Sequence, residues 1–167
     1  AASSGPVHLR SVQRRWFEGA PLAPVDGETV TGAFLRQAKL APGRPVVADQ
    51  TAGLLTYGDI VTRILLLKEP IERLPGEYVG IMLPASVAVN VVYLATLFAG
   101  RTPVMVNWTV GSRNLSHSLD LLGVEAVLTS RALVKRIESQ MGGLEGVGHR
   151  FIYLEDIAAG MSLWRKA

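Results

Sequence analysis

Short runs of apolar and β-branched residues alternate with amphipathic segments along the second half of the chain. Runs of this length, apolar on both faces, are typical of strands buried inside a parallel sheet. Strands that alternate with helices predict βαβ units. The predicted strands are residues 78–83, 102–107, 125–129 and 150–154. The predicted helices between them are 87–99 after the N-cap Ser86, one from Ser112 to Gly123, and one from the cap Ser130 to Gly142-Gly143.

A helix and a hairpin are predicted ahead of these units. The helix runs from about Thr31 to Leu40 and is stopped by Pro42-Gly43. Residues 45–49 and 54–56 flank a Gln-Thr-Ala-Gly turn and predict the hairpin. The expected fold class is therefore α/β, a mostly parallel sheet of βαβ units with helices on both faces, plus a small N-terminal hairpin and helix.

A further helix is predicted directly after the hairpin. Thr56 and Asp59 have the spacing of a capping box at its start. Ile60, Ile64 and Leu67 would share one face of this helix. Pro70 is expected to end it, because proline interrupts the helical hydrogen bonds.

The stretch from Tyr78 to Gly100 contains no charged residue and is long enough to cross a bilayer. Pro84, Ser86 and Asn90 interrupt it, however, and the pattern changes at Pro84 from a β-branched run to a helix with an N-cap. A strand, a turn and a buried helix explain this pattern better than a membrane span. The apolar stretch is therefore expected inside a folded core.

Composition excludes several classes of protein. Of the 167 residues, 49% are hydrophobic and 19% are charged, with a formal net charge of +3 and no cysteine. The apolar content and small net charge exclude intrinsic disorder. The absence of cysteine excludes thiol catalysis and cysteine-based metal sites. With 17 Lys and Arg against 14 Asp and Glu, the chain lacks the basic footprint of a nucleic-acid-binding domain.

No complete active site is evident from the residues, so no catalytic, cofactor-binding or metal-ligating residue is expected. The glycine-rich run 142–148 follows a predicted helix and contains Glu145, which would repel phosphate, so it predicts a surface loop. His117 and Asp120 lie one helical turn apart and could form a hydrogen bond. Glu155-Asp156 predicts a charged helix N-terminus. The absence of a glycine fingerprint excludes a dinucleotide-binding dehydrogenase.

Three segments resemble motifs of the adenylate-forming acyl-activating enzymes, the AMP-binding superfamily. Leu55–Ile60 (Leu-Thr-Tyr-Gly-Asp-Ile) resembles the first core motif, and Tyr78–Ser86 resembles the strand and proline turn that follow it. Leu94–Asn107 is similar to the second core motif. The generic motif has proline two residues before the Asn, whereas here Met105 occupies that place and Pro103 lies two residues earlier.

Further segments resemble one branch of this superfamily, the acyl-[acyl-carrier-protein] synthetase half of the bifunctional 2-acylglycerophosphoethanolamine acyltransferase/acyl-ACP synthetase. They are Pro103–Gly111, Leu128–Arg131 and Ile152–Ile157. The resemblance implies that residues 1–28 are a linker or the tail of an upstream module. Residues 29–167 would be the N-terminal part of an AMP-binding synthetase domain, truncated before the phosphate loop.

The resemblance implies ATP-dependent activation of a fatty acid as an acyl-adenylate, followed by transfer to an acyl carrier protein thiol, with a link to lysophospholipid acylation. ATP and Mg²⁺ would serve the full-length enzyme, and none is expected on this chain, because the family's lysine-ended phosphate loop and ribose-binding Asp are not found in it. The N-terminal residues lack the apolar core of a signal peptide, so a cytoplasmic location is expected. Peripheral contact with the inner face of the membrane stays open.

Trp108 and Thr109, just past the end of a predicted strand, are the candidates for lining a substrate pocket. Ordinary packing at the sheet edge is the alternative for both residues. The alternative function for the chain is a non-catalytic α/β binding or scaffold module. Self-association is expected under either function, because a truncated domain would expose apolar surface.

Overall fold

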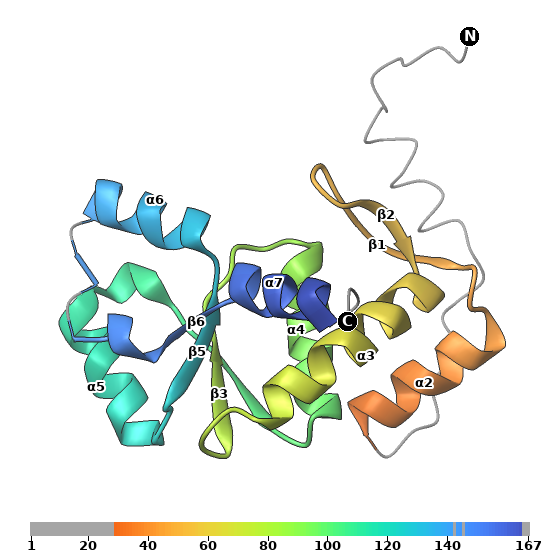
Figure 1. The fold of residues 1–167 in the computed structure, drawn as a ribbon, viewed down its shortest axis with the longest axis horizontal. Coiled ribbons are helices and arrows are strands. Elements are labelled where there is room, and N and C mark those ends of the chain that lie inside the picture. Colours follow the sequence, from red (N-terminus) through yellow and green to blue (C-terminus); the bar gives the residue numbers. More distant parts are fainter. Residues whose placement is uncertain (1–28, 142, 145, 165–167) are drawn as a thin grey trace, which may run out of the picture.

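Four parallel strands form the centre of the structure and lie in the spatial order β4-β3-β5-β6 (Figure 1). The computed structural model describes residues 29–141, 143–144 and 146–164. The strands are β1 (Pro45–Asp49), β2 (Gly53–Thr56), β3 (Tyr78–Ile81), β4 (Thr102–Met105), β5 (Ala126–Thr129) and β6 (Phe151–Tyr153). The α-helices are α2 (Val30–Leu40), α3 (Tyr57–Glu72), α4 (Val87–Phe98), α5 (Ser112–Leu122), α6 (Arg131–Met141) and α7 (Leu154–Trp164). Two short 3₁₀ helices are η1 (Trp108–Val110) and η2 (Gly148–Arg150).

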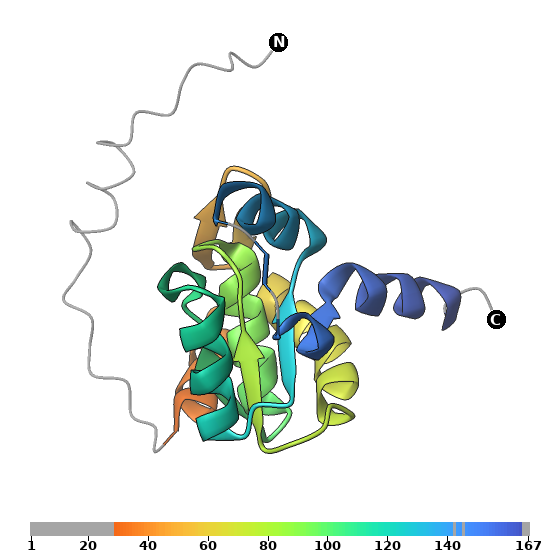
Figure 2. The same ribbon diagram turned by 90° about the vertical axis from the view of Figure 1, so that its left-hand side faces the viewer.

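The two central strands, β3 and β5, are buried on both faces. Val79 and Leu128 belong to a core cluster that includes the inward sides of α3 and α4. Val127, and Met82 just past β3, belong to a second cluster with α5 and α6. Helices therefore cover both faces of the sheet, and Figure 2 shows α3 and α5 on opposite sides of the central strands.

The chain leaves the sheet in both directions from its centre. From β3 it passes through α4 to β4 at one edge, and from β4 it returns through α5 to β5, which pairs with the other side of β3. From β5 it continues through α6 to β6 at the opposite edge. The predicted fold class is confirmed, including the parallel βαβ units and the helices on both faces.

The predicted hairpin is also present, as the antiparallel pair of β1 with β2. The predicted capping box starts α3: Thr56 Oγ1 accepts a hydrogen bond from the Asp59 backbone N at 3.2 Å, and Asp59 Oδ2 accepts one from the Thr56 N at 2.8 Å. α2 packs beside α3 and α4. There the ring of Phe34 lies 5.5 Å from that of Tyr57 and 6.2 Å from that of Phe98, so aromatic contacts join α2 to the core.

The prediction that Pro70 ends the helix is wrong, because α3 continues through it to Glu72. Proline cannot donate a backbone hydrogen bond and crowds the carbonyl four residues earlier, here that of the exposed Leu66. Ile71, the next residue, is fully buried in the first core cluster. Burial of its side chain offsets part of the cost of the proline.

The predicted strands are longer than those observed. The run 78–83 is a strand only as far as Ile81, and 102–107 only as far as Met105. The run 150–154 keeps three strand residues, because η2 precedes it and α7 begins at Leu154. The predicted linker 1–28 and the helix stop at Gly142 lie outside the described residues.

Arg101 holds the turn that leads from α3 into the sheet. Its guanidinium donates to three backbone carbonyls, those of Gly76 at 2.5 Å, Glu72 at 2.8 Å and Leu74 at 3.0 Å. A helix C-terminus leaves carbonyls unpaired and favours a nearby cation. The only charged residue between Glu77 and Arg113 therefore has a structural role.

The edge strand β4 contains Pro103. The backbone nitrogens of Thr102 and Val106 donate to the Glu77 and Ile81 carbonyls on the β3 side. Since donors alternate along a strand, the nitrogen of Pro103 faces away from β3. This is the position in an edge strand that tolerates proline, because no ladder hydrogen bond is lost there.

No helix in the described part of the chain is long and apolar enough to span a bilayer. The uncharged stretch 78–100 forms β3, the turn 82–86 and α4. The interpretation of this stretch as a strand, a turn and a buried helix is confirmed.

Gly80, in the middle of β3, is expected to resist substitution. A Cβ atom added there would lie 2.8 Å from Val127 Cγ2 and 3.2 Å from Val106 Cγ2. Gly80→Ala should lower the free energy of unfolding by about 1–3 kcal/mol through overpacking, measured by urea denaturation. Gly43→Ala is the control, because open space surrounds that position. Equal stabilities of the two variants would contradict the packing argument.

Candidate functional site

The carboxyl ends of the parallel strands converge on one edge of the sheet. In doubly wound sheets, ligands bind in the crevice at this edge, where neighbouring strands continue in opposite directions. Here that place lies between β3, whose chain continues to α4, and β5, whose chain continues to α6. The loop 82–86, the N-termini of these two helices and the loop after β4 are therefore the candidate functional site.

Trp108 and Thr109 lie in η1, just past the carboxyl end of β4. Asn107 Oδ1 accepts hydrogen bonds from the Thr109 N at 3.0 Å and from Thr109 Oγ1 at 2.8 Å, which fixes this turn. Trp108 is half-buried and packs against the second core cluster, whereas Thr109 is exposed. Their contact with a substrate stays a prediction, and they lie one strand away from the junction between β3 and β5.

A carboxylate from the hairpin occupies the N-terminus of α4. Asp49 Oδ2 accepts a hydrogen bond from the Val87 N at 2.7 Å, and Oδ1 accepts from the Ala52 N at 2.6 Å and the Thr51 N at 2.8 Å. The bonds from Ala52 and Val87 are the main cause that lowers the pKa of Asp49 below its ordinary value. One side chain thus closes the hairpin turn, caps the helix and joins the two.

A second carboxylate occupies the N-terminus of α6. Glu155 Oε1 accepts a hydrogen bond from the Arg131 N at 3.0 Å. Ser130 Oγ, predicted as the cap, accepts one from the Leu133 N at 3.2 Å. Glu155 also lies in the first turn of α7, as predicted, so it serves two helix N-termini.

The Arg131 side chain completes this contact between α6 and α7. Its guanidinium donates to Asp156 Oδ2 at 2.9 Å and lies 4.3 Å from the centre of the Tyr153 ring. The hydrogen bond to Asp156 is the main cause that raises the pKa of Arg131. All these charged side chains are exposed, so the ion pair adds little to stability and mainly orients the helix ends.

The positive ends of both helices at the β3–β5 junction are thus taken by acidic side chains of this chain. Free helix N-termini bind phosphate through their N–H groups and dipole. Here Asp49 and Glu155 provide the negative charge that a phosphate would provide. In the described residues, no group of three or more His, Cys, Asp or Glu could hold a metal ion. The positions at which these two helix N-termini would hold a phosphate are therefore occupied by side chains of this chain.

Thr129, at the carboxyl end of β5, is a further polar residue at the junction. It is fully buried, and its Oγ1 has no hydrogen-bond partner. A buried unpaired hydroxyl costs about 1–3 kcal/mol. No sequence pattern singles out Thr129, because the run 125–129 predicts only a buried strand.

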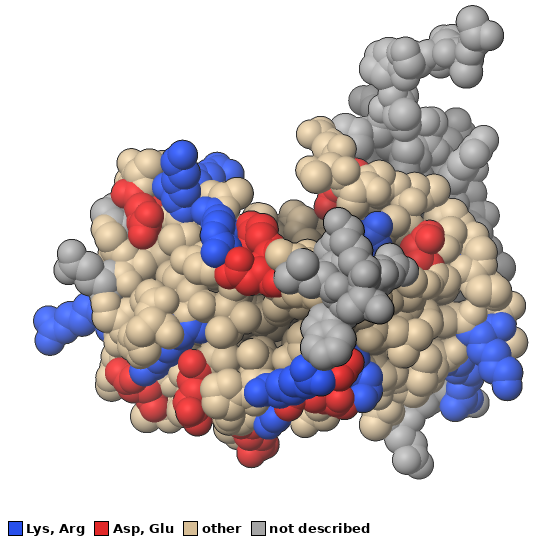
Figure 3. Space-filling model, in the orientation of Figure 1, with Lys and Arg blue, Asp and Glu red and all other residues tan. Residues whose placement is uncertain are grey.

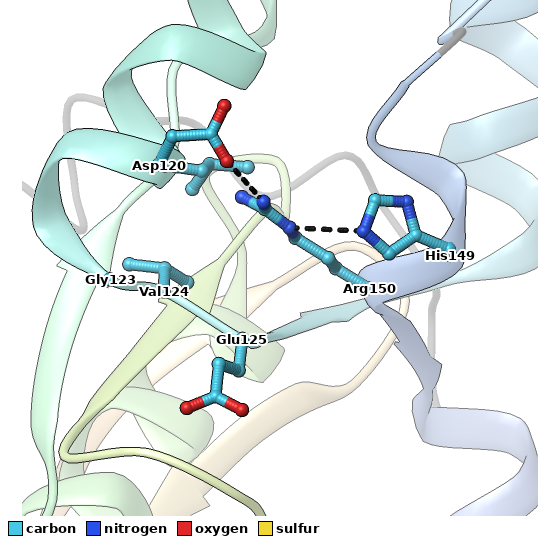
Figure 4. A pocket seen from close by; sticks show the side chains of 7 residues that line it. Asp120, Gly123, Val124, Glu125, His149 and Arg150 are labelled. Atoms are coloured by element: carbon cyan, nitrogen blue, oxygen red, sulfur yellow. Dashed lines mark hydrogen bonds and ion pairs between the residues drawn. The ribbon is translucent and has the colours of Figure 1, made fainter.

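A pocket of about 340 Å³ lies at the other end of the strands, beside the amino ends of β5 and β6 (Figure 4). Arg150, whose side chain is 14% exposed, forms an ion pair with Asp120 and donates through Nε to His149 Nε2 at 3.3 Å. The hydrogen bond from Arg150 is the main cause that lowers the pKa of Asp120. Ligands of parallel α/β sheets bind at the carboxyl ends of the strands, whereas this pocket lies at their amino ends.

The hydrogen bond that the spacing of His117 and Asp120 allows is not formed. Asp120 instead contacts Arg150, and Ser116 Oγ lies 3.5 Å from its Oδ2. His117 is exposed on α5. The glycine-rich run forms a turn and the start of η2 where it is described. The prediction of a surface loop is correct only in part, because Leu144 and Val147 are buried in the second core cluster. Gly142 and Glu145 lie outside the described residues.

Asp49→Asn is expected to destabilise the protein at neutral pH. The amide can still accept from the hairpin turn, but its NH₂ group would face the Val87 N–H, and two donors repel. Because the pKa of Asp49 is lowered in the folded state, its contribution is complete above about pH 4 and is lost as the pH falls through the native pKa.

Urea midpoints of the original protein and Asp49→Asn should therefore differ at pH 7, approach each other as the pH falls below about 4, and converge once it is below the native pKa of Asp49. Glu138→Gln, at an exposed position of α6, is the control and should leave the midpoint unchanged at both values. A difference that persists unchanged into acid would show that the carboxylate charge is not responsible.

Comparison with known proteins agrees with this architecture. Residues 34–163 match the family described as AMP-binding enzymes. The fold is similar to a benzoate CoA ligase from Burkholderia xenovorans LB400, with 24% identity over 68% of this chain and 24% of that chain and a TM-score of 0.56. It is similar to VinN in complex with 3-methylaspartate, with 14% identity over 84% of this chain and 38% of that chain and a TM-score of 0.65.

A third similar structure is O-succinylbenzoate coenzyme A synthetase (MenE) from Bacillus subtilis in complex with ATP and magnesium ion, with 16% identity over 74% of this chain and 33% of that chain and a TM-score of 0.60. The chain thus spans between 24% and 38% of the length of these three proteins. At such identities the similarity establishes the fold, and the family match over more than half of the sequence establishes the relationship. The chain belongs to the AMP-binding enzyme family, the adenylate-forming ligases.

Proposed function

We propose that this chain is the N-terminal fragment of a ligase that uses ATP to activate a fatty acid and passes the acyl group to an acyl carrier protein. The observation that carries the proposal is the order of the motif-like segments. Leu55–Ile60, Tyr78–Ser86 and Leu94–Asn107 follow one another within residues 34–163, the range that matches the AMP-binding family. The segments Pro103–Gly111 and Ile152–Ile157 support the acyl-ACP synthetase branch.

The fragment would supply structure to the enzyme. Its parallel sheet positions the carboxyl edge, and η1 would place Trp108 and Thr109 at one wall of the acyl pocket. The residues that bind ATP and Mg²⁺ would come from other parts of the protein, since the helix N-termini at the junction hold Asp49 and Glu155. A preceding acyltransferase domain would pass the acyl group on to a lysophospholipid.

The proposal predicts that the 167-residue chain does not bind ATP. Isothermal titration calorimetry with ATP and Mg²⁺ should give no heat beyond dilution, because no free phosphate-binding N-terminus is available at the junction. MenE from Bacillus subtilis, solved with ATP and magnesium ion, is the positive control. Micromolar affinity of the chain would contradict the fragment assignment.

The proposal also predicts a role for Trp108 in the whole enzyme. Trp108→Ala should raise the KM for a long-chain fatty acid about tenfold, equivalent to about 1.4 kcal/mol of lost contact. The KM for ATP should stay unchanged, as measured by fatty-acid-dependent exchange of pyrophosphate into ATP.

Two further variants separate pocket contact from packing. Trp108→Phe keeps an aromatic side chain against the second core cluster and should largely restore the KM. Val110→Ala changes an exposed neighbour in η1 and should have no effect. An unchanged KM in Trp108→Ala would remove this residue from the pocket. Failure of the whole protein to activate any carboxylic acid would favour the alternative, a non-catalytic binding or scaffold module.

A further inference from the structure

The C-terminal half of α2 and the loop after it form an exposed corner that combines apolar and basic side chains. Leu40 is 73% exposed and Leu35 is 46% exposed. We call this surface the α2 corner, and its exposed residues are Leu35, Arg36, Lys39, Leu40, Pro42 and Arg44. The corner lies at the end of the molecule farthest from α5 and α6 (Figure 1).

The geometry of α2 explains why these residues share a surface. Phe34 and Ala38, one turn apart, pack inward, and Phe34 contacts Tyr57 and Phe98. At 100° per residue, Leu35, Lys39, Arg36 and Leu40 then follow one another around the opposite side. The outward face therefore carries two cations between two leucines.

All the charges on the α2 corner are positive. Residues 29–48 contain Arg36, Lys39 and Arg44 and no Asp or Glu. Figure 3 shows Lys and Arg side chains gathered over the end of α2 without acidic side chains among them. The start of α3 contacts the loop that follows α2, through the hydrogen bond from Gly58 N to Pro42 O. The start of α3 places one carboxylate, that of Asp59, near the corner, and this carboxylate accepts hydrogen bonds from Thr56 in the capping box.

Four basic residues elsewhere on the described surface form ion pairs with acidic ones. On α3, Lys68 pairs with Glu72, and Arg73 pairs with Glu69. Arg131 pairs with Asp156, and Arg150 with Asp120. None of the ion pairs among the described residues involves the α2 corner, whose three cations thus share one surface with two exposed leucines.

We propose that the α2 corner binds the surface of an anionic lipid bilayer. The three cations would contact lipid phosphates, each contributing on the order of fivefold to binding near the surface. Leu35 and Leu40 would enter the boundary between headgroups and acyl chains. Charge complementarity selects an anionic surface, and the exposed leucines favour a bilayer over a nucleic acid, whose backbone offers no apolar layer.

This contact goes beyond the proposed ligase function and does not depend on it. The corner uses none of the residues at the carboxyl edge. Binding to vesicles can therefore fail while the ligase assignment stands, and the reverse also holds.

Co-sedimentation of the 167-residue chain with vesicles tests the proposal. The chain should bind vesicles of equimolar phosphatidylcholine and phosphatidylglycerol and not vesicles of phosphatidylcholine alone. Raising NaCl from about 0.1 M to about 1 M should release it, because the screening length falls from about 10 Å to about 3 Å.

Arg36→Glu/Lys39→Glu should weaken binding at least about 25-fold, the product of two lost cations. Lys135→Glu/Arg136→Glu, on the exposed side of α6, changes the net charge equally and should retain binding. Leu40→Ser should weaken binding without changing its salt dependence. Circular dichroism of each variant checks that the fold is kept.

Three results would overturn the proposal. They are absence of binding by the original chain, equal binding to both kinds of vesicle, and equal losses in the α2 and α6 double variants. Retention of the chain on duplex DNA, with the same loss in the α2 variant and no binding to vesicles, would assign the corner to nucleic acid instead.

Discussion

The contact between β3 and β5 is the constraint on which the rest of the structure depends. Gly80 of β3 lies so close to Val127 of β5 that a single added carbon would overlap with the valine side chain. Both strands are buried on both faces, and one apolar surface of the sheet would be exposed if either layer of helices were absent. α3 and α4 cover one surface, and α5 and α6 cover the other. Because Gly80 has no side chain, β3 can lie in contact with Val106, Val124 and Val127.

The same constraint determines the chemistry of the carboxyl edge. Because the helices leave β3 and β5 toward opposite faces, two helix N-termini come together at the junction. Their unpaired N–H groups need acceptors. Asp49 reaches one from the hairpin and Glu155 reaches the other from α7, so both elements become fixed to the sheet through electrostatic contacts. The helix N-termini that would attract an anionic ligand instead bind the hairpin and α7 to the central βαβ units.

Local patterns in the sequence were sufficient for most of the fold. The period of apolar residues, the Thr56–Asp59 capping box and the Gly123 helix end act over a few residues, and they appear where they were expected. Pro70 was misjudged because its effect depends on the burial of Ile71, which is a tertiary property. The Asp49–Val87 contact joins residues 38 positions apart, so no local pattern could reveal it. Asp120 likewise contacts Arg150, 30 positions away, in preference to the nearby His117.

Pro103 has a consequence for how the sheet can grow. With its nitrogen directed away from β3, it removes a donor from the outer side of β4, where an incoming strand would need one. The two edges of the sheet therefore differ in how readily they can pair with a further strand. Pro103 hinders pairing at β4, whereas β6 contains no proline. Any strand added by further polypeptide, or by a second molecule, would be directed to the β6 side.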